Sequence, residues 1–227
     1  KGGVNYNINE QHNVYANIGY YSKQPFFNAV YPNNKNFLNQ ELTNEKILGL
    51  EVGYGFKSER FNANLNVYRT TWKDRYETKR NNIILPSGSS LTAYANIFGI
   101  EEVHQGIELE ATANITQYLK LNAAISLGDW FYAKSYLINN DNQNIDTQGN
   151  VLTGDVVPST TYLDKVKVGE TAQTTAAIGA TILPPVKGLK VDIDWRYVDN
   201  LYANLNVADF NSKANADLGA LKLPSYN

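Results

Sequence analysis

The sequence predicts an all-β protein: an antiparallel up-and-down transmembrane β-barrel segment of about eight strands from a larger barrel. Three observations predict it. Eight segments alternate between apolar and polar residues, the connections between them alternate between short and long, and Tyr and Gly are frequent, at 16 each, while charged residues make up 19%. No run approaches the roughly 18 apolar residues of a transmembrane helix, and barrel strands need no such run because they alternate.

The first four segments predict two hairpins. Residues 3–9 and 13–22 are joined by the polar turn NEQHN, and residues 47–57 and 60–72 by KSER. Successive strand residues point to opposite faces. The alternation in FNANLNVYRTTW at 61–72, and in its hairpin partner at 47–57, therefore predicts strands with one apolar and one polar face. The apolar positions are Leu48, Leu50, Val52, Tyr54 and Phe56, then Phe61, Ala63, Leu65 and Val67, and the polar ones include Gly49, Glu51, Gly53, Asn62, Asn64 and Asn66.

The last four segments predict two more hairpins. Residues 103–115 and 119–131 are joined by TQY, and residues 168–183 and 188–199 by PPVKG. In the first of these strands Ile107, Leu109, Ala111, Ala113 and Ile115 oppose Glu108, Glu110, Thr112 and Asn114, and in the last Leu189, Val191, Ile193, Trp195 and Tyr197 oppose Lys190, Asp192, Asp194 and Arg196. The same two-faced pattern therefore runs through both halves of the chain.

The connections predict which ends of the strands lie together. Between the tight turns come long connections at 23–46, 73–102, 132–167 and 200–222. Long structureless loops are uncommon in soluble domains, whereas a membrane barrel has short turns at its periplasmic end and long loops outside. Segments of about 10 to 14 residues also match the roughly 9–11 residues that cross a bilayer at a tilt.

The two strand faces are predicted to meet different media. The apolar face should contact lipid, and the polar face should line a water-filled lumen. The charged residues expected to line the lumen are Glu51, Glu108, Glu110, Asp192, Asp194 and Arg196. Aromatic residues near the strand ends predict interfacial girdles: Tyr20, Tyr21, Tyr68, Trp72, Trp130, Phe131, Tyr132, Trp195 and Tyr197.

Several stretches resemble the TonB-dependent receptors. NEKILGLEVGYGFKSERFNANLNVYRTTWKDRY is similar to a hairpin of that family, in which an E-K…E-G-Y strand precedes an N-x-Y-x-x-x-W-x-D-R strand. The matching residues are Glu45, Lys46, Glu51, Gly53, Tyr54, Asn66, Tyr68, Trp72, Asp74 and Arg75. HQGIELEATANI resembles the following inward strand, and VDIDWRYVDNLYAN with LKLPSY resembles a later strand and the start of the next. The richness in Asn and Tyr resembles receptors of Bacteroidetes.

The resemblance implies a 22-stranded barrel with an N-terminal plug domain. Residues 1–227 would then be a partial barrel domain of late strands, without the plug and the last strands. It also implies active uptake across the bacterial outer membrane of a scarce solute, such as a siderophore–iron complex, a cobalamin or an oligosaccharide. The implied partners are the plug, the remaining strands, TonB, the lipid bilayer and the cargo. Members carry out no covalent chemistry on their cargo, so no enzyme and no cofactor is expected.

Two long connections hold candidate ligand contacts, because binding residues concentrate in loops. The candidates are Phe26, Phe27 and Tyr31 in QPFFNAVYPNN, with Tyr94 and Phe98 in LTAYANIFGI, a segment apolar enough to fold over the barrel mouth. The alternative is that these aromatic side chains pack on neighbouring loops. No metal site is expected, because there is no cysteine and the two histidines lie on separate elements.

Two other protein classes fit the strand pattern. A complete eight-stranded barrel for anchoring or adhesion would pair residues 3–9 with 188–199, whereas a segment of a larger barrel would leave these strands apart. A soluble all-β binding module would bury the apolar face, Leu48 and Leu65 included, against a second sheet. With a formal net charge of -2, nothing favours nucleic acid as a partner.

Overall fold

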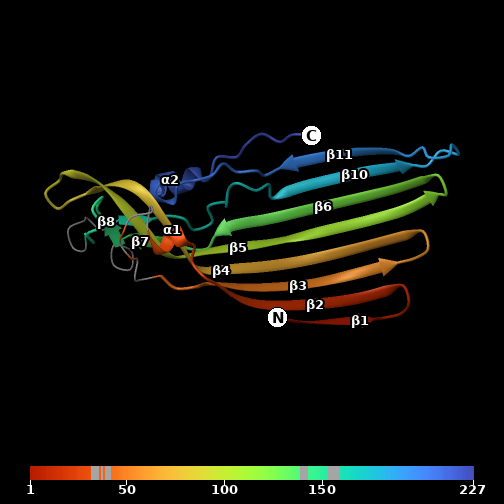
Figure 1. Cartoon of the computed structure of the whole chain (residues 1–227), viewed down its shortest axis with the longest axis horizontal. Helices are drawn as coiled ribbons and strands as arrows, with labels where there is room; N and C mark the ends of the chain where they lie inside the picture. The colour runs from red at the N-terminus through yellow and green to blue at the C-terminus, as the bar shows by residue number, and fades with distance from the viewer. Residues whose placement is uncertain (32–35, 37, 39–41, 139–142, 153–158) are drawn as a thin grey trace.

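The computed structural model describes residues 1–31, 36, 38, 42–138, 143–152 and 159–227. Eight long or medium strands build the main sheet, three short strands accompany it, and three short helices follow or interrupt them (Figure 1). The strands are β1 (Gly2–Asn7), β2 (His12–Lys23), β3 (Glu45–Lys57), β4 (Phe61–Ile84), β5 (Ser90–Thr116), β6 (Leu119–Tyr132), β7 (Tyr136–Ile138), β8 (Gln143–Ile145), β9 (Ser159–Thr161), β10 (Thr174–Ile182) and β11 (Val191–Asp199). The helices are α1 (Phe27–Val30), η2 (Val207–Asp209) and α2 (Lys213–Leu218).

The main sheet is an open antiparallel arc. Its strand order is β1-β2-β3-β4-β5-β6-β10-β11, with β8 attached to β5, while β7 and β9 form a separate pair. Strands β1 and β11 lie at opposite edges and do not pair with each other (Figure 1). The up-and-down segment of a larger barrel is therefore confirmed, and the closed eight-stranded barrel is wrong.

The strand register confirms the two predicted faces. Leu65 lies opposite Tyr54 on β3 and Leu109 on β5, whereas its neighbour Asn66 lies opposite Gly53 and Glu108. No described part of the chain covers the apolar face, and its side chains remain exposed, Val52 at 60% and others similarly. A soluble module would bury these residues against a second sheet, so that alternative is also wrong. Among the described residues no helix is long and apolar enough to cross a bilayer.

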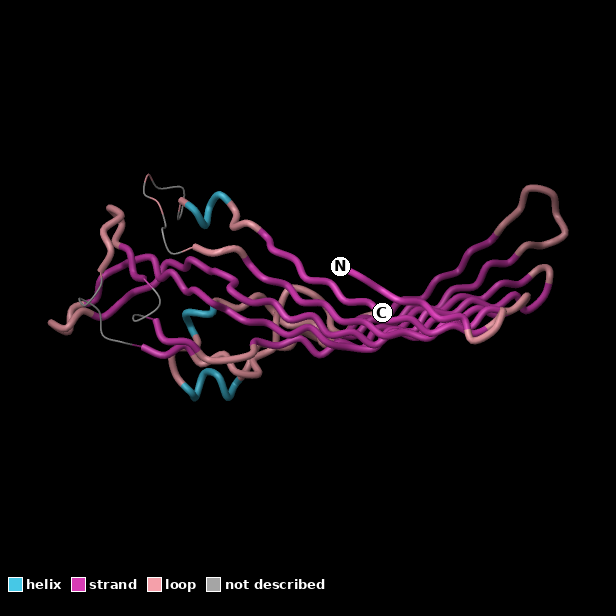
Figure 2. Tube along the Cα trace, turned by 90° about the horizontal axis from the view of Figure 1, so that it is seen from below, coloured by secondary structure: helices cyan, strands magenta, loops and turns pink. Residues whose placement is uncertain are grey.

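The connections are sorted by length between the two ends of the sheet. Figure 2 shows every helix at the end opposite the short turns, with the long connections gathered around the helices. This arrangement confirms the predicted division between short turns and long connections. The chain after β11 also returns to the sheet, since Tyr226 forms an antiparallel bridge with Val198. The LKLPSY segment therefore lies beside the end of β11 and the residues that follow it.

Residues 73–102 do not form the predicted loop. Strand β4 continues for 24 residues to Ile84 and β5 begins at Ser90, so the two make a hairpin that extends well beyond the other strands (Figure 1). The register shifts between Trp72 and Glu77, where Asp74 has a φ of 56°. Such a bulge inserts an extra residue and changes which side chains share a face, so the alternation that predicts strands is interrupted there.

Two strands start later than predicted. The expected segment 168–183 is a strand only from Thr174, because Gln173 replaces regular pairing with side-chain hydrogen bonds. Its Oε1 accepts from the Trp130 backbone N–H at 2.9 Å, and its Nε2 donates to the Trp130 carbonyl at 3.0 Å. The segment predicted from residue 188 begins at Val191, because Gly188, with a φ of 82°, still belongs to the turn.

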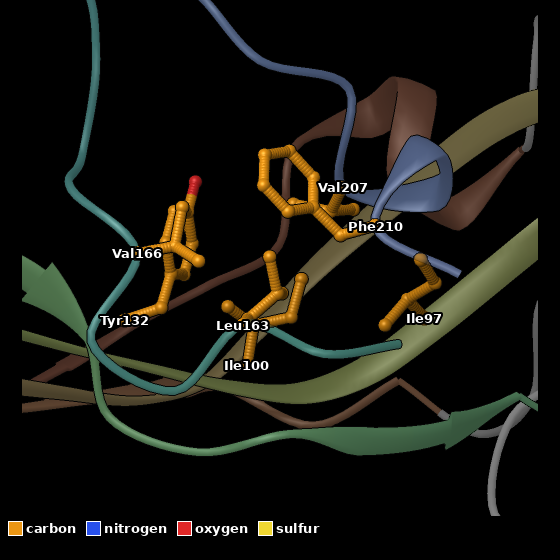
Figure 3. Close-up of a cluster of buried hydrophobic side chains, with 7 residues drawn as sticks. All are labelled: Ile97, Ile100, Tyr132, Leu163, Val166, Val207 and Phe210. Carbon is orange, nitrogen blue, oxygen red and sulfur yellow. The ribbon is translucent and has the colours of Figure 1, made fainter. Parts of the chain in front are cut away.

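The long connections build a small apolar core at their own end of the sheet, opposite the short turns. It contains Ile97, Ile100, Tyr132, Leu163, Val166, Val207 and Phe210, drawn in Figure 3. These side chains come from β5, β6, the segment before β10 and the segment after β11. Leu163 and Val207 are fully buried. The segments that contain them therefore pack against each other and against β5 and β6.

Candidate functional site

A hollow of about 740 Å³ lies on the polar face of the sheet. Strands β1 to β6 supply its lining, which consists of Lys1, Gly2, Gly3, Asn17, Ile18, Gly19, Tyr21, Ile47, Gly49, Leu50, Glu51, Tyr68, Thr70, Trp72, His104, Glu108 and Trp130. Gly19 and Gly49 face each other across β2 and β3. A Cβ on Gly49 would meet no atom closer than 3.8 Å, so the floor of the hollow is open at Gly49.

Other glycines of the polar face are covered by aromatic rings. A Cβ on Gly53 would lie 2.0 Å from the Tyr15 ring, and one on Gly19 would lie 2.5 Å from the Tyr21 ring. The Tyr15 hydroxyl is also held by the Asn64 side-chain amide, which donates to it at 3.2 Å. Glycine therefore lets these rings lie flat against the sheet. Because the rings do not project far from the sheet, they leave the space of the hollow open.

One wall of the hollow is a stack of aromatic rings. The His104 imidazole lies 4.8 Å from the Trp130 ring at an interplanar angle of 11°, and the Trp72 ring lies 6.1 Å from His104 on its other neighbouring strand. Trp130 Nε1 donates a hydrogen bond of 3.0 Å to the Tyr68 hydroxyl. Trp72 Nε1 is buried and has no hydrogen-bond partner among the described residues.

A buried ion pair supports this wall on the side of the long connections. Glu102 is 3% exposed, forms an ion pair with Arg75, and lies 3.2 Å from His104 Nε2 through its other carboxylate oxygen. A buried carboxylate requires such partners because it has lost its water. Burial raises the pKa of the neighbouring Tyr132, and the Glu102 charge adds to that effect. The upper wall is therefore a pre-organised set of polar contacts above the rings.

Acidic side chains without cationic partners lie on the polar face. Glu51 accepts a hydrogen bond of 3.1 Å from Asn17, and Glu108 accepts one of 3.4 Å from Asn66. Neither carboxylate forms an ion pair with any residue that the structure describes. Both line the hollow together with Lys1, so two carboxylates that form no ion pair lie beside a wall of rings. No group of three or more His, Cys, Asp or Glu in the described ranges could hold a metal ion.

Comparison with known proteins identifies the architecture. The whole sequence, residues 1–227, matches the family described as TonB dependent receptor-like, beta-barrel. The chain belongs to this TonB-dependent receptor family. The apolar face of its sheet is accordingly the lipid face in the bacterial outer membrane, and the polar face is the lumen. The family consists of receptors and transporters.

Solved structures show the same fold. The iron transporter FrpB from Neisseria meningitidis aligns with 17% identity and a TM-score of 0.54 over 87% of this chain and 26% of that one. The ferric-catecholate import receptor Fiu from E. coli aligns with 14% identity and a TM-score of 0.51, covering 87% and 24%. The copper transporter OprC aligns with 15% identity and a TM-score of 0.54, covering 87% and 25%. The chain spans about a quarter of the length of these proteins, and no curated relative matches it.

The predicted lumen residues lie on the expected face of the receptor barrel, but only two reach the hollow. Glu110 lies opposite Asn64, and Asp194 lies opposite Gly179, both on the polar face. Asp192 and Arg196 share the parity of Asp194 on β11. Strand β11 is the edge strand opposite β1, so these residues lie several strands away from the hollow. Glu51 and Glu108 are thus the members of the predicted set that meet the aromatic wall.

The first group of predicted loop aromatics lies outside the hollow. Phe26 is 65% exposed and Phe27 71% exposed, at the start of α1. The Phe27 and Tyr31 rings lie 4.9 Å apart, and Lys23 Nζ lies 4.4 Å from the Phe26 ring. Phe27 therefore contacts Tyr31 and Phe26 contacts Lys23, while Phe26 and Phe27 keep most of their surface open.

The second group does not lie in a loop at all. Tyr94 is 9% exposed and pairs with Ile145 of β8, and Phe98 is half-buried, with its ring 5.4 Å from Tyr76. Both belong to β5, so their predicted placement in a loop is wrong, while their predicted contact with a ligand stays a prediction. The bulge near Asp74 is the physical reason, because it hides the strand periodicity in this region.

The aromatic wall contains residues that sequence reasoning assigned to the lipid interface. Tyr68, Trp72 and Trp130 have the parity of Asn66 and Glu108, so they face the lumen instead of forming a girdle. Tyr21 and Tyr132 also lie on the polar face, whereas Tyr20, Phe131, Trp195 and Tyr197 have the apolar parity that a girdle requires. Counting parity from the clean central positions of each strand would have separated the two sets.

Proposed function

We propose that this chain forms part of the barrel of an outer-membrane receptor that imports a scarce solute with energy delivered through TonB. Membership of the family supports the proposal. The similar structures include an iron transporter, a ferric-catecholate import receptor and a copper transporter. We propose a siderophore–iron complex as the first cargo class, with cobalamin and oligosaccharide as the other two. The proposed role is carriage of the cargo without covalent chemistry.

We further propose that residues 1–227 are a partial barrel domain completed by other strands and by a plug domain. The open edges support this proposal, because the outer side of β1, and that of β11 apart from the bridge at Val198, need strand partners inside a membrane. The coverage of about a quarter of each similar receptor also supports it. Within the completed barrel, the plug would occupy the space that the polar face encloses.

The observation that carries the proposed function is the lumen-facing hollow with its unpaired carboxylates. Glu51 is half-buried beside the aromatic wall, and Glu108 lies on the other side of Tyr68, two strands away. Partly buried carboxylates are stabilised by a nearby positive charge. We propose that basic residues of the plug supply this charge, which would fix the plug against β3 and β5. The position of the plug inside the barrel would then depend on the carboxylates of Glu51 and Glu108.

The rings provide the second half of the proposed function. We propose that the stack of Trp72, His104 and Trp130 contacts cargo that has reached the lumen, and that the exposed rings of Phe26 and Phe27 contact it outside. Aromatic faces bind flat or cationic groups through stacking and cation–π attraction. The buried Trp72 Nε1 donor would gain an acceptor if a side-chain shift brought it to the cargo.

Uptake by the full-length receptor tests this function. Cells that express it would receive labelled ferric siderophore, cobalamin or oligosaccharide, with and without TonB. We expect TonB-dependent accumulation of one cargo class, and a loss of tenfold or more in Glu108→Gln and Trp130→Ala at equal amounts of folded receptor. Ser126→Ala is the matched control, because Ser126 lies opposite Glu108 on the same face but does not line the hollow. Accumulation that does not require TonB would refute the proposal.

A further inference from the structure

On β4, β5 and β6 the lipid face changes from apolar to polar and charged at one row of residues. On β4 the outward positions Phe61, Leu65 and Val67 are exposed apolar residues, and the next outward position is Arg69. About 27 Å of strand separates Phe61 from Arg69 at 3.4 Å per residue. At a strand tilt of 35–45° this corresponds to about 20 Å of depth, close to the roughly 25 Å apolar band of outer-membrane barrels. Arg69 therefore lies at the outer edge of the hydrocarbon.

The same row continues across the neighbouring strands as a chain of polar contacts. Arg69 lies opposite Gln105, which lies opposite Asp129. Arg69 Nη1 donates to Gln105 Oε1, Gln105 Nε2 donates to Asp129 Oδ2 at 3.0 Å, and Lys167 forms an ion pair with the other Asp129 oxygen. The side chains on this lipid-facing row are thus linked over three strands and the segment that precedes β10.

More cations surround this row than acids. Lys165 Nζ lies 4.1 Å from the ring of Phe131, which faces the lipid side, and Lys73 is the outward residue of β4 two positions beyond Thr71. We define the cationic collar as Arg69, Lys73, Lys165 and Lys167. Arg69, Lys73 and Lys165 have no acidic partner among the residues that the structure describes.

The neighbouring ion pairs do not neutralise the collar. Lys46 forms an ion pair of 2.6 Å with Asp74, which raises the pKa of the lysine. Six cations, the four of the collar with Lys46 and Lys134, thus stand against four acids, Asp74, Glu101, Asp129 and Asp164, which leaves a local charge of two above zero. The whole sequence has a formal net charge of -2, so positive charge is concentrated at this place on the lipid side.

We propose that the cationic collar binds the phosphate groups of anionic lipids at the outer edge of the membrane, with their acyl chains on the apolar face below. Charge complementarity supports the proposal, because lipid phosphate is the anion found where an apolar band meets water. Continuity supports it too, since the collar begins one outward position above Val67 and Leu127. Arg69 keeps most of its donors for a phosphate oxygen, because only Nη1 has a partner.

Lipid binding by the intact receptor in detergent tests the collar. The probe is fluorescent phosphatidic acid, titrated into purified full-length receptor. The triple variant Arg69→Gln, Lys73→Gln and Lys165→Gln removes the three unpaired cations. The matched control removes three exposed cations at the short-turn end, Lys57→Gln, Arg60→Gln and Lys187→Gln, so that both triple variants have the same net charge.

The collar variant should bind phosphatidic acid roughly 100-fold more weakly than the control. Each cation close to an anionic lipid surface contributes about a factor of five, from about 1 kcal/mol each. High salt should weaken binding to the unchanged receptor and should affect the collar variant less. Lys73→Gln alone, which leaves every described contact of the row intact, should lose about fivefold and provides a test if the triple variant does not fold.

Three results would overturn the proposal. The first is equal affinity of the collar and control variants for phosphatidic acid. The second is competition by inorganic phosphate as strong as that by the lipid, because the site would then be a free-anion site. The third is equal binding of phosphatidylcholine, which would show that acyl chains alone account for the affinity. None of these readouts involves cargo uptake, so they are independent of the proposed transport function.

Discussion

Placing an arginine on either face at the same depth tests the assignment of the two faces. Ile125 and Ala124 are neighbours on β6, and their register partners on β5 are Leu109 and Glu110. Ile125 is one of the five apolar outward positions of β6 below Asp129 and is not at either end of that row, so it lies within the lipid band near its middle. An arginine at the midplane of a barrel costs about 2–4 kcal/mol on the lipid face. Ile125→Arg should therefore shift the folding equilibrium by roughly 30- to 1000-fold.

Ala124→Arg is the matched comparison. It adds the same side chain one residue away, but toward the lumen, where the Glu110 carboxylate lies on the adjacent strand. Its free energy of unfolding should change by less than about 0.5 kcal/mol. Along the lipid face, Leu127→Arg should cost less than Ile125→Arg because it lies closer to the collar, where the penalty falls to about 0–1 kcal/mol.

The assay is urea unfolding of the full-length receptor in lipid vesicles, followed by tryptophan fluorescence and by heat-modifiable migration on gels. Ile125→Arg should lower the urea midpoint strongly, and Ala124→Arg should leave it within error of the unchanged receptor. Equal effects of the two substitutions would mean that both faces meet the same medium. That result would refute the lumen and lipid assignment.

Four further substitutions test local features. Gly53→Ala should lower the free energy of unfolding by roughly 1 kcal/mol, because a tyrosine ring lies on Gly53, whereas Gly49→Ala should be neutral; equal urea midpoints would contradict this. Leu163→Ala should cost about 2–5 kcal/mol locally, seen as faster hydrogen exchange in the outer core with an unchanged barrel. Asn150→Ala should raise the pKa of Asp146, because the Asn150 amide lowers it through a hydrogen bond. In the unchanged protein this hydrogen bond stabilises the turn above about pH 3.9, and the stabilisation is lost as pH falls through the depressed pKa. A carboxyl NMR titration would measure the pKa of Asp146 in both proteins.

The faces of the central strands could be predicted from sequence because the medium on each side dictates residue type. Leu65, Tyr54 and Leu109 form one lipid-facing row across three strands, and each was assigned to that face by alternation alone. Alternation has a period of two and needs no knowledge of partners. It therefore survives as long as the strand is regular, and it gave eight strands of the main sheet with errors only at their ends.

The aromatic wall was missed for a different physical reason. Trp72 and Trp130 lie at strand ends, where an interfacial girdle is also expected, and residue type alone cannot distinguish lipid from lumen there. The apolar core around Leu163 and Phe210 was beyond reach as well. Its members come from segments far apart in the sequence and have no common period, so only the tertiary fold brings them together.

The carboxylates of the hollow and the cationic collar are proposed to bind different partners, although the net charge of the whole sequence is small. Glu51 and Glu108 lie on the lumen face and Arg69 and Lys73 on the lipid face, and none of the four forms an ion pair with a residue that the structure describes. A sheet that separates two media keeps such charges apart, and each set creates its own local field. Glu108→Gln should therefore impair uptake while phosphatidic acid binding is retained, and the collar variant should do the reverse. Loss of both properties in either variant would show that the two regions are coupled through the barrel wall.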